Sequence, residues 1–278
     1  MKTSVFRIML LFALLLASCA GKNESFSFVQ LCDPQLGMGG YVEDQNSFRL
    51  AIEKINDMDV DFAVICGDLV HHASDSSFAD LQDLLDDFEI PCYLVPGNHD
   101  VGNEPTDLTL AFYRELMGED YYKKKHKGIS FIFTNSQLWK SDLGEESRMH
   151  HEWFTEMLSG QKKNKRSVVI GHYPLYIKDI NEEEGYSNLP VEIRKELIDL
   201  FTAHNVVAYL TGHKHALTVN NYMGIQLVSG ESTSKNFDGR LKGFRKWDVQ
   251  ADTLIHSFVP LPSVPYSSNM LPEKLRAE

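Results

Sequence analysis

Cysteine is scarce in this sequence, which has only four cysteines among its 278 residues. No two of them have the Cys-x-x-Cys spacing, and Cys19 belongs with the apolar leader that precedes it, which leaves Cys32, Cys66 and Cys92 as an odd set. Neither a disulfide framework nor a zinc site made of thiolates is therefore supported. The three cysteines lie in or beside apolar runs, so we expect them to pack as small hydrophobic side chains.

Basic residues are in deficit as well. The chain has 27 Lys and Arg against 39 Asp and Glu, a formal net charge of −12. A surface of this charge repels polyphosphate, so we expect no binding to a nucleic-acid backbone. Internal repeats and low-complexity tracts are absent, and the length and 43% hydrophobic content are typical of one large folded domain. Although Lys and Arg are few, the chain has 11 histidines, which need an explanation.

The first eighteen residues have the pattern of a signal peptide: a basic start followed by the apolar run 8–17. The segment ends in Leu16-Ala17-Ser18-Cys19, which resembles the bacterial lipobox. We expect residues 1–18 to be removed, Cys19 to carry lipid, and residues 19–25 to tether a domain outside the inner membrane of a bacterium, on the periplasmic or outer-membrane side. A simple secretory signal or an uncleaved anchor helix is the alternative, although the run is short for a membrane span.

Short apolar runs alternate with longer amphipathic stretches over residues 26–259, which indicates an α/β fold in a single domain. Strands are predicted over residues 26–32, 62–66, 92–95, 129–133, 168–170 and 206–210. Helices are predicted over 45–58, 78–88, 108–117, 153–158 and 193–201. From residue 217 an antiparallel meander is expected, and residues 260–278 are expected to form an irregular tail.

Side chains able to bind a metal follow five of these predicted strands. They are Asp33 and Gln35, Asp68, Asn98 and His99, His172, and finally His213 and His215. Ligands of α/β sheets bind beyond the carboxyl ends of the strands, so these side chains are expected to converge although they span some 180 residues. Carboxylate, amide and imidazole ligands suit Mn, Mg, Fe or Zn better than thiolate-bound metals. A glycine precedes Asp68, Asn98, His172 and His213, where the backbone must turn close to a ligand.

These residues resemble the motifs of the calcineurin-like metallophosphoesterases. Asp33-Pro-Gln35, Gly67-Asp68, Gly97-Asn98-His99, His172 and Gly212-His213-Lys-His215 stand where that family has Asp-x-His, Gly-Asp, Gly-Asn-His, His and Gly-His-x-His. Gly-Asp-Leu-Val-His71, the extended motif 97–106 and Asn135-Ser136-Gln137 look like its calcineurin-like phosphoesterase domain-containing branch, a serine/threonine-phosphatase-like group. The resemblance implies a four-layer α/β/β/α sandwich with two metal ions.

Carried over to this chain, the resemblance implies one divalent ion on Asp33, Asp68, His215 and position 35. The second ion would lie on Asp68, Asn98, His172 and His213, with Asp68 bridging because a carboxylate has two oxygens. Two such ions can lower the pKa of a shared water, and the resulting hydroxide attacks a phosphate ester. His99 is the candidate general acid for the departing alkoxide, with a purely structural contact as the alternative.

Two positions depart from the wider family pattern. Gln35 stands where histidine is usual, and because an amide oxygen is a harder and weaker ligand than imidazole, we expect a preference shifted toward Mn or Mg. His71 stands where phosphoprotein phosphatases have an aspartate that orients the catalytic histidine. His71 and Asp100 are candidate pocket residues.

Phosphomonoester hydrolysis is the leading expectation for function. One alternative is a phosphodiesterase acting on nucleotides, lipids or envelope fragments, which uses the same metal core. A second alternative is a catalytically inactive protein that binds a phosphate ligand. The remaining histidines are expected at the surface: His126 in the basic turn 123–127, and His150, His151, His204 and His256 elsewhere. The acidic run 182–184 is expected in an exposed loop, from which Tyr186 or Asn188 could reach a substrate.

Overall fold

The computed structural model describes residues 25–162, 165–251 and 253–262. The predicted signal peptide, the lipid attachment site Cys19 and nearly all of the predicted tether lie outside the described residues, as does most of the predicted C-terminal tail. The named strands and helices run from Phe26 to Pro260.

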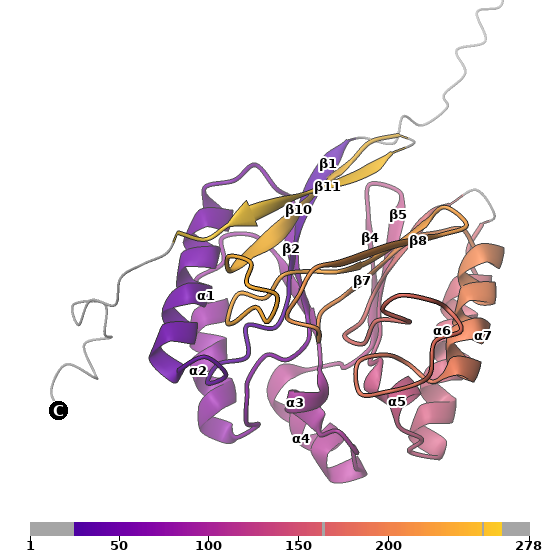
Figure 1. Ribbon diagram of the computed structural model, residues 1–278, viewed down its shortest axis with the longest axis horizontal. Helices are drawn as coiled ribbons and strands as arrows, with labels where there is room; N and C mark the ends of the chain where they lie inside the picture. Colours follow the sequence, from indigo (N-terminus) through magenta and orange to yellow (C-terminus); the bar gives the residue numbers. More distant parts are fainter. Residues whose placement is uncertain (1–24, 163–164, 252, 263–278) are drawn as a thin grey trace, which may run out of the picture.

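The strands form two sheets (Figure 1). The first has the order β11-β10-β1-β2-β3, with bounds Leu254–Pro260, Gly243–Val249, Phe26–Leu31, Phe62–Cys66 and Cys92–Val95. The second has the order β4-β5-β6-β7-β9-β8, with bounds Tyr122–His126, Ile129–Phe133, Ser167–Ile170, Val206–Thr211, Ile225–Ser229 and Thr218–Tyr222. β1, β2 and β3 are parallel, and so are β5, β6, β7 and β9, so the carboxyl ends of neighbouring strands lie together in each sheet.

Helices cover the outer face of each sheet (Figure 1). Beside the first sheet lie α1 (Tyr41–Asn56), α2 (Asp75–Leu85) and α4 (Asp107–Met117), and beside the second lie α6 (Glu145–Ser159) and α7 (Val191–Ala203). Two single turns, α3 (Asn98–Val101) and α5 (Gln137–Lys140), follow strands β3 and β5. None of the helices in the described part of the chain has the length and apolar character needed to cross a bilayer.

Three separate hydrophobic clusters fill the spaces between these layers. Strand β1 contributes to two of these clusters. Phe26 and Phe28 pack in the cluster between the two sheets, whereas Val29 and Leu31 pack against the helices of the first sheet. Successive strand residues face opposite sides, so a strand buried on both faces reads as a continuous apolar run. The predicted four-layer α/β/β/α sandwich is confirmed.

One buried amide ties the two sheets together. Gln30 of β1 donates through Nε2 to the carbonyl oxygens of Thr211 (3.0 Å) and Val228 (3.2 Å) in the second sheet. Its Oε1 accepts a hydrogen bond from Trp247 Nε1 at 3.0 Å. Both polar atoms of this fully buried amide therefore have hydrogen-bond partners. The bonds join the two sheets near the carboxyl ends of β1 and β7.

The six predicted strands and five predicted helices are all present, with ends shifted by a few residues and helix α6 begun earlier, at Glu145. The prediction of one C-terminal meander is wrong, because β8 and β9 join the second sheet while β10 and β11 join the first. Cys32 and Cys66 are buried as expected and Cys92 is half-buried, all three as free thiols.

Two expectations about histidines are also wrong. His126 lies in the edge strand β4 rather than in a basic turn, and its Nε2 is 2.6 Å from Asp61 Oδ2. His150 lies on the buried face of α6, where its Nε2 is 2.7 Å from Thr134 Oγ1, so it is not a surface residue. Charged neighbours in the sequence predicted exposure at both positions. Burial is decided by packing against another element, which the local pattern does not show.

Candidate active site

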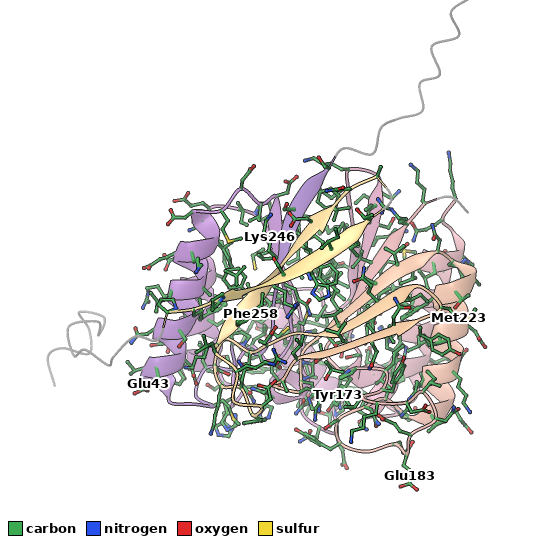
Figure 2. The ribbon with its side chains drawn as sticks, turned by 45° about the horizontal axis from the view of Figure 1, so that its top comes forward. Glu43, Tyr173, Glu183, Met223, Lys246 and Phe258 are labelled. Atoms are coloured by element: carbon green, nitrogen blue, oxygen red, sulfur yellow. The ribbon has the colours of Figure 1, made fainter. Side chains whose placement is uncertain are left out.

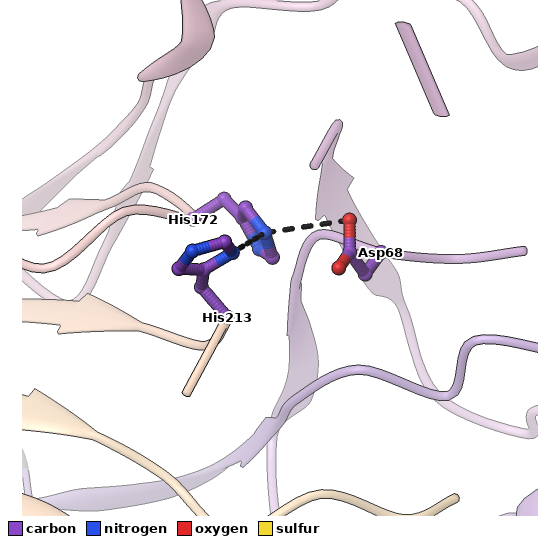
Figure 3. Close-up of side chains that lie close together, drawn as sticks. All are labelled: Asp68, His172 and His213. Carbon is purple, nitrogen blue, oxygen red and sulfur yellow. Dashed lines mark hydrogen bonds and ion pairs between the residues drawn. The ribbon is translucent and has the colours of Figure 1, made fainter. Parts of the chain in front are cut away.

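The residues that follow the strands come together at the carboxyl ends of both sheets. Two groups of buried side chains have potential ligand atoms within 4.8 Å of one another: Asp33, Asp68 and His215, and Asp68, His172 and His213. Asp68 belongs to both groups. Figure 3 shows its carboxylate facing His172, with His213 beyond, and the distance from Asp68 Oδ1 to His172 Nε2 is 3.3 Å. The structure therefore places a carboxylate between two sets of ligands, as two neighbouring metal ions require.

The backbone is strained at these positions. Among the described residues with positive φ other than glycine are Asp33 (48°), Gln35 (35°), Asp68 (49°), His213 (68°) and His215 (47°). Non-glycine residues seldom adopt this left-handed region, and such outliers gather at functional sites because the surrounding structure must hold them there. The chain turns sharply after the strands in order to aim these side chains inward.

Main-chain carbonyl groups orient the imidazoles. His172 Nδ1 donates to the Cys66 carbonyl (2.8 Å), His215 Nδ1 to that of Lys235 (2.7 Å), and His213 Nε2 to that of Tyr186 (3.0 Å). Each bond fixes one ring nitrogen as the proton donor and leaves the other with a lone pair. The free nitrogens are His172 Nε2, His215 Nε2 and His213 Nδ1, which are those that face the carboxylates or each other. Histidines that bind metals are held in this way.

Charge in the site favours a cation. Burial raises the pKa of the Asp33 carboxyl, with His215 and His172 opposing it. Burial also raises the pKa of Asp68, but His172, His99 and His213 together outweigh burial and hold that pKa below its usual range. Burial lowers the pKa of His172, yet the charge and hydrogen bond of Asp68, the charge of Asp33 and the Cys66 carbonyl together outweigh burial and raise it to about 9. The two carboxylates thus stabilise positive charge at the position between them.

Two amide side chains lie beside these groups and could add ligands. Asn98 is buried with Oδ1 3.1 Å from His172 Nε2, while its Nδ2 donates to Asn103 and to the Tyr186 hydroxyl, so the oxygen is the atom aimed at the site. Gln35 is also buried, and its Nε2 lies 3.3 Å from His71 Nδ1. Gln35 Oε1 and Asp33 Oδ2 are buried oxygens without a hydrogen-bond partner among the described residues. Unpaired buried oxygens are costly, and a bound cation would satisfy both, so the donor set fits two divalent metal ions.

His99 lies beside the shared carboxylate. Its backbone N–H donates to Asp68 Oδ1 at 2.9 Å, and its Nδ1 donates to the His71 carbonyl at 2.8 Å, which leaves Nε2 available. The His71 ring stacks on His99 with centroids 4.8 Å apart. Asp100, in contrast, is buried and its carboxylate accepts hydrogen bonds from the backbone N–H groups of Leu69, Val70 and Gly97, so it holds the loops together and does not face a pocket.

Tyr186 is the site residue that the sequence pattern indicates least. Its hydroxyl accepts a hydrogen bond from Asn98 Nδ2 (3.2 Å), and its ring lies 4.8 Å from that of His213, yet its side chain is largely exposed. Asn188, also considered from the sequence, is buried and instead supports the loop by bonding Glu182 and the Gly185 N–H. The exposed acidic run preceding Tyr186 was the only indication of this loop.

The 177–189 loop that carries Tyr186 is held by two charged side chains. The Glu182 carboxylate accepts hydrogen bonds from the backbone N–H groups of Ile177, Lys178 and Asp179. The guanidinium of buried Arg194 donates to the carbonyl oxygens of Ile180, Glu182 and Leu189. Glu183, labelled in Figure 2, projects outward from the loop. The loop is therefore ordered around Tyr186 and exposes its remaining acidic residues to solvent.

Comparison with known proteins gives consistent matches. The calcineurin-like phosphoesterase family matches residues 27–217. The chain is 32% identical over 262 residues to a Bos taurus protein named serine/threonine-protein phosphatase CPPED1, covering 85% of this chain and 84% of the relative. It is 25% identical over 230 residues to a Ruthia magnifica protein named probable cyclic nucleotide phosphodiesterase, covering 81% and 94%. The crystal structure of a dimetal phosphatase from Danio rerio superposes with a TM-score of 0.66 at 14% identity, covering 84% of this chain and 95% of that one.

The family match extends over more than half of the chain, and the two ligand groups that share Asp68 lie at the positions of its motifs. The calcineurin-like phosphoesterase family implies two divalent ions, and the two ligand groups described above fit them. The chain belongs to the calcineurin-like phosphoesterase family and is a metal-dependent hydrolase of phosphate esters.

Proposed function

We propose that this enzyme is a phosphomonoesterase that resembles serine/threonine phosphatases in its reaction. The observation that carries the proposal is the position of His99 beside Asp68, the carboxylate common to both ligand groups. Two divalent cations contribute a charge of +4 and the Asp33 and Asp68 carboxylates −2, so the occupied site carries about +2. A pocket of that charge suits a phosphate dianion, which a monoester presents and a diester does not.

Two divalent ions held by these residues would lower the pKa of a water between them and neutralise the phosphoryl oxygens. The contribution of the protein is to place the acid. His99 Nδ1 is occupied by the His71 carbonyl, so Nε2 is the atom from which a proton reaches the departing alkoxide oxygen. Asp68 holds the backbone of His99 and so fixes the acid relative to the metal ligands.

The proposal extends to the metal. Gln35 offers a neutral amide oxygen in the group formed by Asp33, Asp68 and His215, and two oxygens of that group have no protein partner among the described residues. Oxygen-rich sites favour harder ions, so we propose Mn or Mg at this position. Elemental analysis of protein purified without added metal tests this, and two tightly held Zn or Fe ions per chain would contradict it. The Gln35→His variant is expected to retain more Zn.

The function is tested with full-length protein and four metals, Mn, Mg, Fe and Zn, by comparing an aryl phosphate, a bis-aryl phosphate and phosphoserine. We expect the monoesters to be hydrolysed at least about tenfold faster than the diester. Asp68→Asn should lower the rate by about 10²–10³-fold or more, because it removes a charge that both ligand groups share. Asp199→Asn, at an exposed position of α7, is the matched control. Failure to hydrolyse any ester with any metal would refute the proposal.

A phosphodiesterase is the second candidate, and the Ruthia magnifica relative named as a cyclic nucleotide phosphodiesterase favours it. The same assay decides between the two, because a diesterase would hydrolyse the bis-aryl ester faster than the monoesters.

We further propose that the domain is a lipoprotein tethered through Cys19 to the bacterial cell envelope, on its extracytoplasmic side. The support is the sequence Leu16-Ala17-Ser18-Cys19 after an apolar run. Partition of the protein expressed in a bacterium between detergent and aqueous phases tests the proposal. The Cys19→Ser variant should move to the aqueous phase or stay unprocessed, and unchanged processing and partition would contradict lipidation.

A further inference from the structure

A second concavity opens beside the catalytic histidine. It has a volume of about 460 Å³ and lies between the start of α1 and the first turns of α2. Its walls include Gly37, Tyr41, His71, Ser74 and Asp80, and we call it the Asp80 pocket. Volumes of this size are typical of sites for small ligands. None of the site residues described above, apart from His71, lines it.

The Asp80 pocket borders the proposed catalytic site. Leu36 and Gly37, which line it, directly follow Gln35 in the chain. His71 forms the shared wall: its Nδ1 lies 3.3 Å from Gln35 Nε2, and its ring stacks on that of His99. A Cβ added at Gly37, where φ is +108°, would lie 3.4 Å from both His71 and Tyr41, so the backbone, His71 and Tyr41 already meet closely at the entrance.

The position of His99 determines which part of a substrate enters this pocket. A general acid must lie within hydrogen-bond reach of the leaving oxygen. If His99 Nε2 gives its proton to that oxygen, the alcohol attached to the oxygen departs on the side of His99 where the His71 ring and the Asp80 pocket lie. The phosphoryl group would then remain beside Asp33 and Asp68, and the leaving group would extend toward Asp80.

The chemistry of the pocket selects among leaving groups. Asp80 is its only carboxylate, and none of the described residues that line it is a lysine or arginine. The Tyr41 hydroxyl donates to Asp80 Oδ2 at 2.8 Å, and the ring of Tyr41 is 38% exposed at the pocket. A carboxylate next to an aromatic face attracts an ammonium group and repels a second carboxylate. Serine hydroxyls nearby, including that of Ser74, add neutral hydrogen-bonding groups.

We propose that the Asp80 pocket binds the leaving group of the substrate and selects phosphate monoesters whose alcohol carries a primary ammonium group. This inference rests on the proposed phosphomonoesterase function. Because the pocket is open to solvent, the preference is modest: an ammonium contact with a half-buried carboxylate and an aromatic ring changes kcat/KM by about tenfold.

The test compares three small esters with the Mn-loaded, full-length protein: O-phosphoethanolamine, n-propyl phosphate and phosphoglycolate. Their alcohols are similar in size and differ in charge. We expect kcat/KM to be highest for the ammonium ester, about tenfold lower for the neutral ester, and lower again for the carboxylate. Asp80→Asn should reduce the ratio of the first two rates to about one. Asp83→Asn, an exposed position on the same helix, should leave it unchanged.

A binding measurement separates failure of this inference from failure of the proposed function. Titration calorimetry should show O-phosphoethanolamine binding about tenfold more weakly to the Asp80→Asn variant than to the wild type. Equal rates and affinities for the ammonium and neutral esters in the wild type, or equal effects of Asp80→Asn on both, would overturn the inference while monoester hydrolysis stands. Binding that depends on Asp80 without turnover of any ester would support the pocket and refute the phosphomonoesterase.

Discussion

Replacing Gly97 by alanine tests whether the shared carboxylate sets the geometry of the site. A Cβ at Gly97 would lie 2.2 Å from Asp68 Oδ1 and 2.3 Å from Asp68 N, far inside van der Waals contact. The backbone nitrogen is not a flexible side-chain end, so one of the two loops must move by about 1 Å. A misplacement of that size costs about 10²-fold in rate, and overpacking of this kind lowers the free energy of unfolding by about 1–3 kcal/mol.

The assay pairs turnover of an aryl phosphate with elemental analysis after dialysis against Mn. We expect Gly97→Ala to lose about 10²-fold in kcat/KM and to retain fewer than two ions per chain. Gly185→Ala is the matched control, because a Cβ there meets no atom within 4 Å and the residue belongs to the loop that carries Tyr186. If Gly97→Ala kept two ions and activity within about threefold of wild type, the position of Asp68 would not control the site, and the reasoning would be refuted.

Two further predictions concern stability. Burial, then His151 and Arg114, lowers the pKa of His150 from 6.5 to about 3. The unfolded chain therefore takes up a proton below pH 6.5 that the folded chain does not. Titration of His150 leaves the free energy of unfolding unchanged above pH 6.5 and lowers it by about 2–3 kcal/mol by pH 4.5. Urea unfolding at several pH values should show a shallower acid loss in His150→Phe; identical slopes would contradict the assignment. Gln30→Leu leaves Trp247 Nε1 and the carbonyl oxygens of Thr211 and Val228 without their partner, and should lower the free energy of unfolding by about 3 kcal/mol. Gln250→Leu, at an exposed position, is its control, and a loss of equal size there would show that the cross-sheet bonds contribute nothing.

The ligand residues could be predicted because each depends on local features. Asp68 and His172 follow short buried strands directly, and the glycine before each allows the sharp turn, so position in the chain already fixed position in space. His99 and Asp100 show the limit of that reasoning. They are neighbours in one motif. The His99 side chain lies beside the site, whereas the Asp100 carboxylate accepts hydrogen bonds from backbone N–H groups, among them that of Leu69 in the loop after β2.

The features that escaped prediction depend on contacts between distant segments. Strand β4 carries Lys123, Lys124 and Lys125, and only its pairing with β5 makes it a strand. The four C-terminal strands are distributed between two sheets because β9 pairs with β7 and β10 with β1, which no local pattern encodes. Tyr186 reaches the site through the bonds that Arg194 and Glu182 make within its loop.

The hydrogen bond from His213 Nε2 to the carbonyl of Tyr186 links the 177–189 loop to the metal ligands. The Tyr186 hydroxyl also accepts a hydrogen bond from Asn98, so this loop contacts two of the side chains proposed to bind the second ion. Thermodynamic linkage makes such a connection reciprocal: whatever free energy the ordered loop adds to metal binding, the bound metal must add to the ordering of the loop. Removal of an ion bound at these ligands and loosening of the 177–189 loop would therefore be two effects of a single equilibrium.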